Sequence, residues 1–202
     1  MHAELCVCAL LPKVDTVTKL SLVLHFQESF KPSNTGRLAH LCLPNSQVFL
    51  RGEPEKRPDP LELLVEGREN LLLHLADDSV ELNPEFVRGL AKPVNLIVPD
   101  GTWAQASRAG RRISAQLTGQ VRSVKLKIEP GRPSIYRLRE EHHPDGMATF
   151  EAIARALEML EGPQVCAPLE KIFRIMTDRV LWTRGKLAAE EVFGGLPSLA
   201  RI

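Results

Sequence analysis

The residues best placed to do chemistry are the four that follow an apolar run near the middle of the chain, Asp100-Gly101-Thr102-Trp103. They present a carboxylate, a hydroxyl and an indole within a few residues of one another. A carboxylate beside an apolar indole can have a raised pKa, which brings it nearer the working range of a general base. Asp-Gly in a turn and a Trp packed beneath a helix are also ordinary structure, so the segment alone leaves both interpretations open.

The surrounding sequence predicts that these four residues lie where a strand ends and a helix begins. Val94 and residues 96–98 are typical of a strand, and Pro99 cannot donate to a strand ladder. Helix-forming residues follow Trp103, which makes Thr102 the expected N-cap. Open α/β sheets bind their ligands at this edge, where helix N-termini offer free amides.

Positive charge is concentrated just after this segment. The net charge of the whole chain is only +1 and favours no class of partner. Between residues 101 and 139, however, Glu129 is the single acid against nine basic residues. This excess predicts a phosphate-bearing partner, although each side chain could simply be solvated. The nine residues are Arg108, Arg111, Arg112, Arg122, Lys125, Lys127, Arg132, Arg137 and Arg139.

A second polar cluster lies between His25 and Arg37, after the first expected strand. Asn34 and Thr35 are good helix N-caps, which would explain them without a ligand. Gly36 would let a backbone approach closely. Capping does not explain why this short stretch is so rich in polar groups, because Lys31 and Arg37 also lie in it and neither is a capping residue.

The alternation of strand-like and helix-like segments predicts an α/β fold with a mostly parallel sheet flanked by helices. Thr149 is the expected N-cap of a late helix, and Glu151 in its first turn suits the helix dipole. Strands are expected at residues 19–26, 47–51, 70–75, 94–98, 123–128 and 134–139, and helices at 61–67, 84–91, after 102, from 150 to about 160, and at 169–183.

Composition predicts a globular protein. The 202 residues are 44% apolar and 25% charged, which suits one domain over 1–202 with a short cysteine-containing segment at 1–18. No apolar run approaches the ~20 residues that span a bilayer, and the start does not read as a signal peptide. We therefore expect a cytoplasmic protein with no membrane partner, whereas its oligomeric state stays open. Four sparse cysteines without a Cys-x-x-Cys predict reduced thiols and no metal site.

Four segments, taken together in this order, resemble the DTW-domain family, tRNA-uridine aminocarboxypropyltransferases related to the SPOUT class. They are Lys31-Pro32-Ser33-Asn34-Thr35-Gly36-Arg37-Leu38, Leu73-His74-Leu75-Ala76-Asp77, Asp100-Gly101-Thr102-Trp103, and Tyr136-Arg137-Leu138-Arg139 leading to Thr149-Phe150-Glu151-Ala152. The resemblance implies S-adenosylmethionine as cofactor and tRNA as partner. It implies transfer of the 3-amino-3-carboxypropyl group to N3 of a uridine. It also implies a SPOUT-like fold with a C-terminal trefoil knot.

The resemblance suggests roles for individual residues. Asp100 is the candidate base for uridine N3, or it holds the amino group of the cofactor. Trp103 would stack on the uridine or pack under its helix, and Thr102 would cap that helix and orient Asp100. The residues expected to bind the cofactor are Asn34, Thr35, Leu75, Ala76, Asp77, Val98, Arg137, Thr149 and Glu151. From the distribution of positive charge, and not from the resemblance, the residues expected to bind RNA are Lys31, Arg37, Arg108, Arg111, Arg112, Lys125 and Lys127.

Two features depart from the family pattern. Members usually carry a Cys-x-x-Cys ahead of the Cys-x-Cys, together a zinc site, but here the chain begins only five residues before Cys6, so we carry no zinc over. Ala148 stands where the family usually has Ser. Two other functions stay open: an RNA methyltransferase, and a non-catalytic RNA-binding module. The module would not need an acid at the centre of its positive surface.

Overall fold

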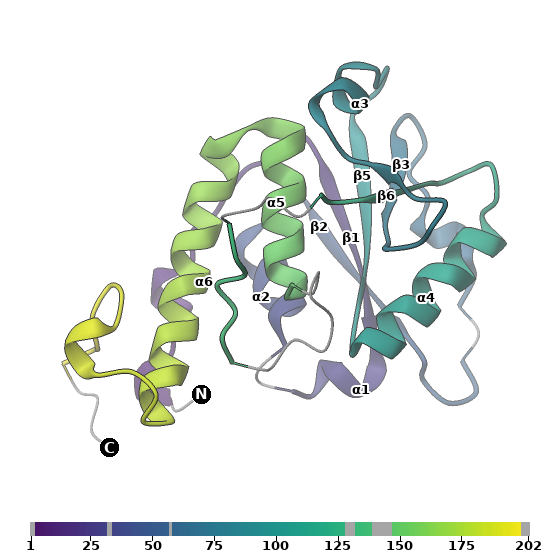
Figure 1. Ribbon diagram of the computed structural model, residues 1–202. Coiled ribbons are helices and arrows are strands. Elements are labelled where there is room, and N and C mark those ends of the chain that lie inside the picture. Colours follow the sequence, from purple (N-terminus) through teal and green to yellow (C-terminus); the bar gives the residue numbers. More distant parts are fainter. Residues whose placement is uncertain (1–2, 32–33, 57, 128–131, 139–146, 199–202) are drawn as a thin grey trace.

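The computed structural model describes residues 3–31, 34–56, 58–127, 132–138 and 147–198. These residues form a six-stranded parallel sheet with strand order β2-β1-β5-β3-β6-β4 (Figure 1). The predicted parallel α/β architecture is therefore confirmed. The strands are β1 (Lys19–His25), β2 (Ser46–Arg51), β3 (Glu69–Leu73), β4 (Val80–Glu81), β5 (Val94–Asp100) and β6 (Arg122–Lys125).

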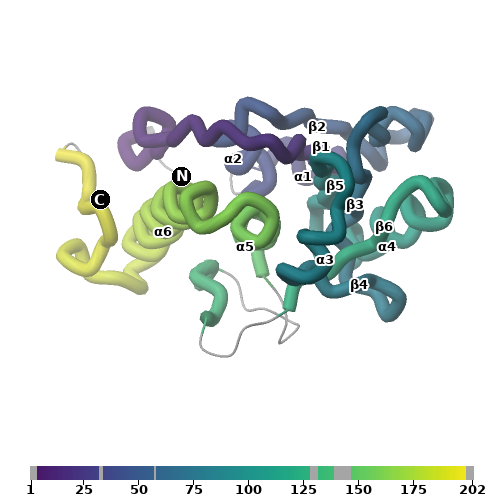
Figure 2. The backbone as a smooth tube through the Cα atoms, turned by 90° about the horizontal axis from the view of Figure 1, so that it is seen from above, coloured from purple at the N-terminus to yellow at the C-terminus, as the bar shows by residue number. Residues whose placement is uncertain are grey.

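Helices cover both faces of the sheet. The helices α2, α5 and α6 lie on one face, and α4 lies on the other (Figures 1 and 2). The α-helices are α1 (Phe26–Ser29), α2 (Thr35–Cys42), α3 (Pro84–Arg88), α4 (Trp103–Gln116), α5 (Thr149–Glu161) and α6 (Pro163–Thr183). Short 3-10 helices are η1 (Ala3–Leu5), η2 (Cys8–Leu10), η3 (Pro60–Leu63) and η4 (Ala189–Glu191).

The central strand β5 explains the two-layered core. Every residue of β5 is buried, as expected for a parallel strand covered on both faces. Its side chains alternate between the faces: Leu96 and Val98 join the cluster formed with α2, α5 and α6. Ile97 joins the other cluster with Ile113 and Leu117 on the α4 side. The carboxyl end of β5 is thus fixed by packing on both sides.

Three sequence predictions of helices and strands are wrong. The helix expected at 61–67 is only the short 3-10 helix η3 at Pro60–Leu63. Residues 134–138 form no strand, because the Ser134 hydroxyl and the Ile135 backbone N–H donate to the Glu151 carboxylate instead of a ladder. The last long helix begins at Pro163 rather than at residue 169. Pro168 lies inside it and removes one backbone hydrogen bond without ending the helix.

The cysteines behave in two ways. Cys6 and Cys8 are joined in a disulfide, with Cα atoms 5.5 Å apart, a separation that a disulfide can span. Cys42 and Cys166 are free and buried. The expectation of reduced thiols is therefore wrong for the first pair and confirmed for the second. Within the described ranges, no group of three or more His, Cys, Asp and Glu side chains is arranged to hold a metal.

Residues 128–131 and 139–146, in the half of the chain where the trefoil knot is expected, lie outside the described residues. The knot therefore stays a prediction. In the part of the chain that the structure describes, no helix combines the length and apolar character needed to cross a membrane.

Candidate active site

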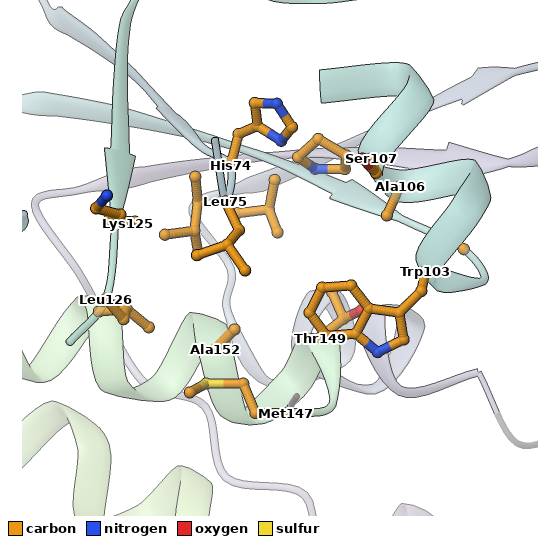
Figure 3. Close-up of a pocket in the computed structure, with 14 residues that line it drawn as sticks. His74, Leu75, Trp103, Ala106, Ser107, Lys125, Leu126, Met147, Thr149 and Ala152 are labelled. Carbon is orange, nitrogen blue, oxygen red and sulfur yellow. The ribbon is translucent and has the colours of Figure 1, made fainter. Parts of the chain in front are cut away.

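A pocket of about 370 Å³ opens at the carboxyl edge of the sheet, where β3, β5 and β6 end beside the first turns of α4 and α5 (Figure 3). Of the residues expected to bind cofactor or RNA, or to act in catalysis, Leu75, Val98, Trp103, Lys125 and Thr149 line it. The other lining residues are Leu73, His74, Pro99, Gly101, Ala106, Ser107, Leu126, Met147 and Ala152.

Asp100 is the buried carboxylate next to this pocket, with only 5% of its surface exposed. Asn34 donates to its Oδ2 from Nδ2 at 2.6 Å, and the Thr149 hydroxyl donates to its Oδ1. Burial raises the pKa of Asp100, a shift that these two hydrogen bonds oppose and the negative charge of Glu28 reinforces. The carboxylate is therefore fixed in position while its charged form is poorly solvated.

Asn34 and Thr149 bring two helix N-termini onto this one carboxylate. Asn34 is the N-cap of α2, where its Oδ1 accepts from the Arg37 backbone N–H at 2.7 Å. Thr149 is the first residue of α5, whose N-cap is Ala148. The prediction that Thr149 caps this helix is therefore wrong, because its hydroxyl donates to Asp100 instead.

Gly36 makes room for this arrangement. A Cβ atom at residue 36 would lie 2.7 Å from Oδ2 and 2.8 Å from Cγ of Asp100, closer than real side chains approach. The expectation at Gly36 is a close approach by backbone, but the group that approaches is the side-chain carboxylate of Asp100. The first turn of α2 therefore packs directly against the acid.

Thr102 and Trp103 form the first turn of α4. The Thr102 hydroxyl accepts from the Gln105 backbone N–H at 3.3 Å, and the Gln105 side chain accepts from the Thr102 backbone N–H at 2.8 Å. This capping box confirms Thr102 as the N-cap. Trp103 is 42% exposed and lies at the pocket (Figure 3). Among the described residues, the hydrogen bonds of Thr102 serve the helix, whereas Asn34 and Thr149 hold Asp100.

Other residues expected to bind the cofactor lie outside the pocket lining. Glu151 is buried and accepts from Ser134, from the Ile135 backbone and from Arg155. Arg137 pairs with the buried carboxylate of Asp178 at 2.8 Å. Thr35 is buried in the first turn of α2, while Ala76 is half-buried and Asp77 exposed in the turn after β3.

The basic residues singled out from the sequence divide, within the described ranges, into those that form an ion pair with an acid and those that do not. Three arginines pair with acids from other parts of the chain. Arg122 pairs with Glu69, and Arg137 pairs with Asp178. Arg132 pairs with both Glu158 and Glu170. Lys31 pairs with Glu28 at 2.6 Å. Arg139 lies outside the described residues. Of these basic residues, the exposed cations without an ion pair among the described residues are Arg37, Arg108, Arg111, Arg112 and Lys127, whereas Lys125 is half-buried.

His74 is a pocket residue that we did not single out from the sequence. It is 7% exposed, and its Nε2 atom has no hydrogen-bond partner among the described residues. A Cβ atom at Gly110 would lie 2.4 Å from its Nδ1, so α4 packs onto the ring where a glycine allows it. Burial, with a contribution from Arg111, lowers the pKa of His74. Its place in the strand-end segment 73–77 was the available signal.

Comparisons with known proteins identify a family that matches most of the chain. Residues 1–181 match the DTW domain. Similar curated proteins are tRNA-uridine aminocarboxypropyltransferase 2 of Macaca fascicularis, 26% identical over 163 residues, and the protein of the same name in Drosophila melanogaster, 31% identical over 163 residues. Each alignment covers 78% of this chain, but only 53% of the macaque protein and 62% of the fly protein. No solved structure matches significantly.

Proposed function

Since the chain belongs to the DTW domain family, whose domain matches residues 1–181, we propose that it transfers the 3-amino-3-carboxypropyl group of S-adenosylmethionine to N3 of a uridine in tRNA. One observation carries the proposal: Asp100-Gly101-Thr102-Trp103 places a buried carboxylate and a half-exposed indole beside the same pocket. A cytoplasmic location and a knotted C-terminal half belong to this proposal.

The pocket suits this cofactor in size and in chemistry. Its volume of about 370 Å³ lies within the range of about 300–1,000 Å³ that small-molecule sites occupy. Leu75, Leu126 and Met147 supply apolar surface for an adenine ring (Figure 3). When bound, S-adenosylmethionine supplies a carbon that its sulfonium makes electrophilic.

Asp100 can serve the reaction in two ways. Its raised pKa brings it nearer the range in which a carboxylate accepts a proton from uridine N3. Alternatively, its negative charge attracts the cationic groups of the cofactor. Asn34 and Thr149 orient the carboxylate in both cases. The two roles differ in measurable terms, because the first affects the rate of transfer and the second affects cofactor affinity.

Trp103 is the residue we assign to the uridine. Its indole is exposed at the pocket, and the Thr102–Gln105 capping box fixes the start of the helix that carries it. Stacking of a base on an aromatic side chain contributes about 1–3 kcal/mol. We expect Trp103→Ala to weaken tRNA binding and to leave the affinity for S-adenosylmethionine less affected.

The exposed arginines of α4 extend the surface that we assign to RNA. Arg108, Arg111 and Arg112 are all exposed on the helix that begins at Trp103. For Arg108→Ala combined with Arg112→Ala, the salt slope of tRNA binding should fall by roughly 0.7–0.9 for each lost phosphate contact. Cofactor affinity should not change. An unaltered slope would move the RNA surface elsewhere, first to the Lys31–Arg37 segment.

Product analysis tests the proposed reaction. Purified protein is incubated with S-adenosylmethionine and unmodified tRNA, and both the nucleosides and the small-molecule product are identified by mass spectrometry. Aminocarboxypropyl-uridine together with methylthioadenosine is the expected result. S-adenosylhomocysteine would show methyl transfer instead. Binding of tRNA without either product would favour a non-catalytic RNA-binding module.

A further inference from the structure

Lys125 is the one formally charged side chain among the described residues that line the pocket. It is the last residue of β6 and is half-buried. The other titratable lining residue, His74, has a pKa lowered by burial, which favours its neutral form. The lining therefore presents a single cation and no anion of its own.

The ammonium group of Lys125 makes no ion pair or hydrogen bond with another described residue. Neighbouring cations of the sequence differ in this respect. Arg122, on the same strand, pairs with Glu69 at 3.1 Å and lies over the Phe86 ring at 4.9 Å. Arg132 lies between Glu158 and Glu170. A half-buried cation without a counterion is a favourable partner for an anionic group of a ligand.

The pocket is polarised from one side to the other. Lys125 lies on the opposite side from Trp103 and Thr149 (Figure 3). On the side opposite Lys125, Thr149 is hydrogen-bonded to the buried carboxylate of Asp100, and the negative charge of Glu28 acts on Asp100. A ligand with an anion at one end and a cation further along would therefore fit this field in one orientation.

We propose that Lys125 binds the carboxylate of the aminocarboxypropyl group of S-adenosylmethionine, an inference that rests on the function proposed above. The carboxylate is the one anionic group of this cofactor; its ammonium is bonded to the same carbon, whereas the cationic sulfonium lies at the far end of the propyl chain. With the carboxylate at Lys125, the sulfonium and the electrophilic carbon bonded to it would lie toward Asp100 and Trp103. Lys125 thus belongs to the cofactor site, and phosphates are left to the exposed cations of α4 and to Lys127.

Two cofactors that differ only in the carboxylate test this assignment: S-adenosylmethionine and its decarboxylated analogue. Affinities are measured by titration calorimetry on the protein without RNA, for wild type, Lys125→Met and Lys125→Arg. Lys125→Met keeps most of the aliphatic stem and removes the charge. Its affinity for S-adenosylmethionine should fall about 10-fold to 100-fold, the range expected for loss of a hydrogen bond to a charged group. Its affinity for the analogue should change less than about twofold.

Control variants complete the design. Lys125→Arg should keep most of the preference for the carboxylate, and Lys127→Met, two residues further on and exposed, should leave both affinities unchanged. The proposal is overturned if Lys125→Met weakens both ligands equally, because Lys125 would then only shape the pocket. It is also overturned if neither affinity changes while the salt slope of tRNA binding falls. If wild type binds neither ligand, the proposed cofactor itself is wrong.

Discussion

Two buried carboxylates, Asp100 and Glu151, illustrate different uses of an acid in this protein. Glu151 is 1% exposed and accepts from a hydroxyl, a backbone N–H and the Arg155 guanidinium. Asp100 is 5% exposed and accepts from an amide and a hydroxyl, with no ion pair among the described residues. Charge compensation makes Glu151 a structural anchor, whereas Asp100 keeps an uncompensated charge beside a pocket. A ligand carrying positive charge can supply what Asp100 lacks.

The largest stability effect is expected at the compensated acid. Glu151→Gln leaves the buried Arg155 without its anion, and breaking a buried pair in this way typically costs about 3–5 kcal/mol. Urea unfolding measures the loss. Glu62→Gln is the matched control, since Glu62 is 53% exposed in its pair with Arg51 and should change stability by only about 0–1 kcal/mol. Equal effects of the two variants would refute the contrast.

Asp100→Asn should reverse the pattern, with a large loss of rate and little loss of stability. The pKa of Asp100 is raised on folding, so the folded protein loses stability as the pH rises above the pKa that this carboxyl has in the unfolded chain. An uncharged amide at this position removes that loss of stability. The amide can still accept from Asn34 and donate to Thr149. We expect unfolding free energy to stay equal or rise, and transfer to slow by roughly 100-fold or more. A near-normal rate with normal cofactor affinity would show that Asp100 is not the base.

Gly36→Ala probes how tightly the site holds its acid. The added Cβ would press on the Asp100 carboxylate, which Asn34 and Thr149 hold in place, so we expect a loss of about 1–3 kcal/mol. Unfolding experiments and transfer assays should both register the change. At Gly89 the nearest atom to a new Cβ is 3.4 Å away, an ordinary contact, so Gly89→Ala should be nearly neutral. Full tolerance of Gly36→Ala would mean that the carboxylate moves freely.

The smallest expected effect concerns pH. The pKa of His74 is lowered by burial, so the unfolded chain takes up a proton before the folded one does, and stability falls as the pH drops below about 6.5. This group contributes at most about 1.4 kcal/mol per pH unit. His74→Leu should reduce the loss of stability between pH 7 and pH 5.5. A variant with an unchanged pH dependence would assign the loss to other groups, His40 among them.

Much of the fold could be predicted from local patterns. The strands around Leu22, Leu71 and Leu96 are continuous apolar runs, as parallel strands buried on both faces must be. Thr102 could be identified as an N-cap because capping depends on residues within one turn. Thr149 was misassigned because its hydroxyl has a partner far along the chain, and no local pattern reveals that partner.

Some residues of the candidate site could likewise be predicted from local sequence, whereas others could not. Asp100 and Trp103 stand out by type and spacing, since an acid and an indole at a strand-to-helix turn are visible in the sequence. The role of Lys125 could not be predicted. It belongs to a run of basic residues whose members look alike until the fold pairs some with distant acids, exposes others and places this one in a pocket.

The sequence by itself determined the alternation of strands and helices, the strand end that carries Asp100, and the cap that fixes Trp103, because each depends on hydrophobic periodicity or on residues within one turn. Only the tertiary structure decided which groups meet at that end. It brought the first turns of α2 and α5 onto one carboxylate, set Gly36 against it, and left Lys125 opposite. Those contacts join residues tens of positions apart, and packing of the whole sheet sets them.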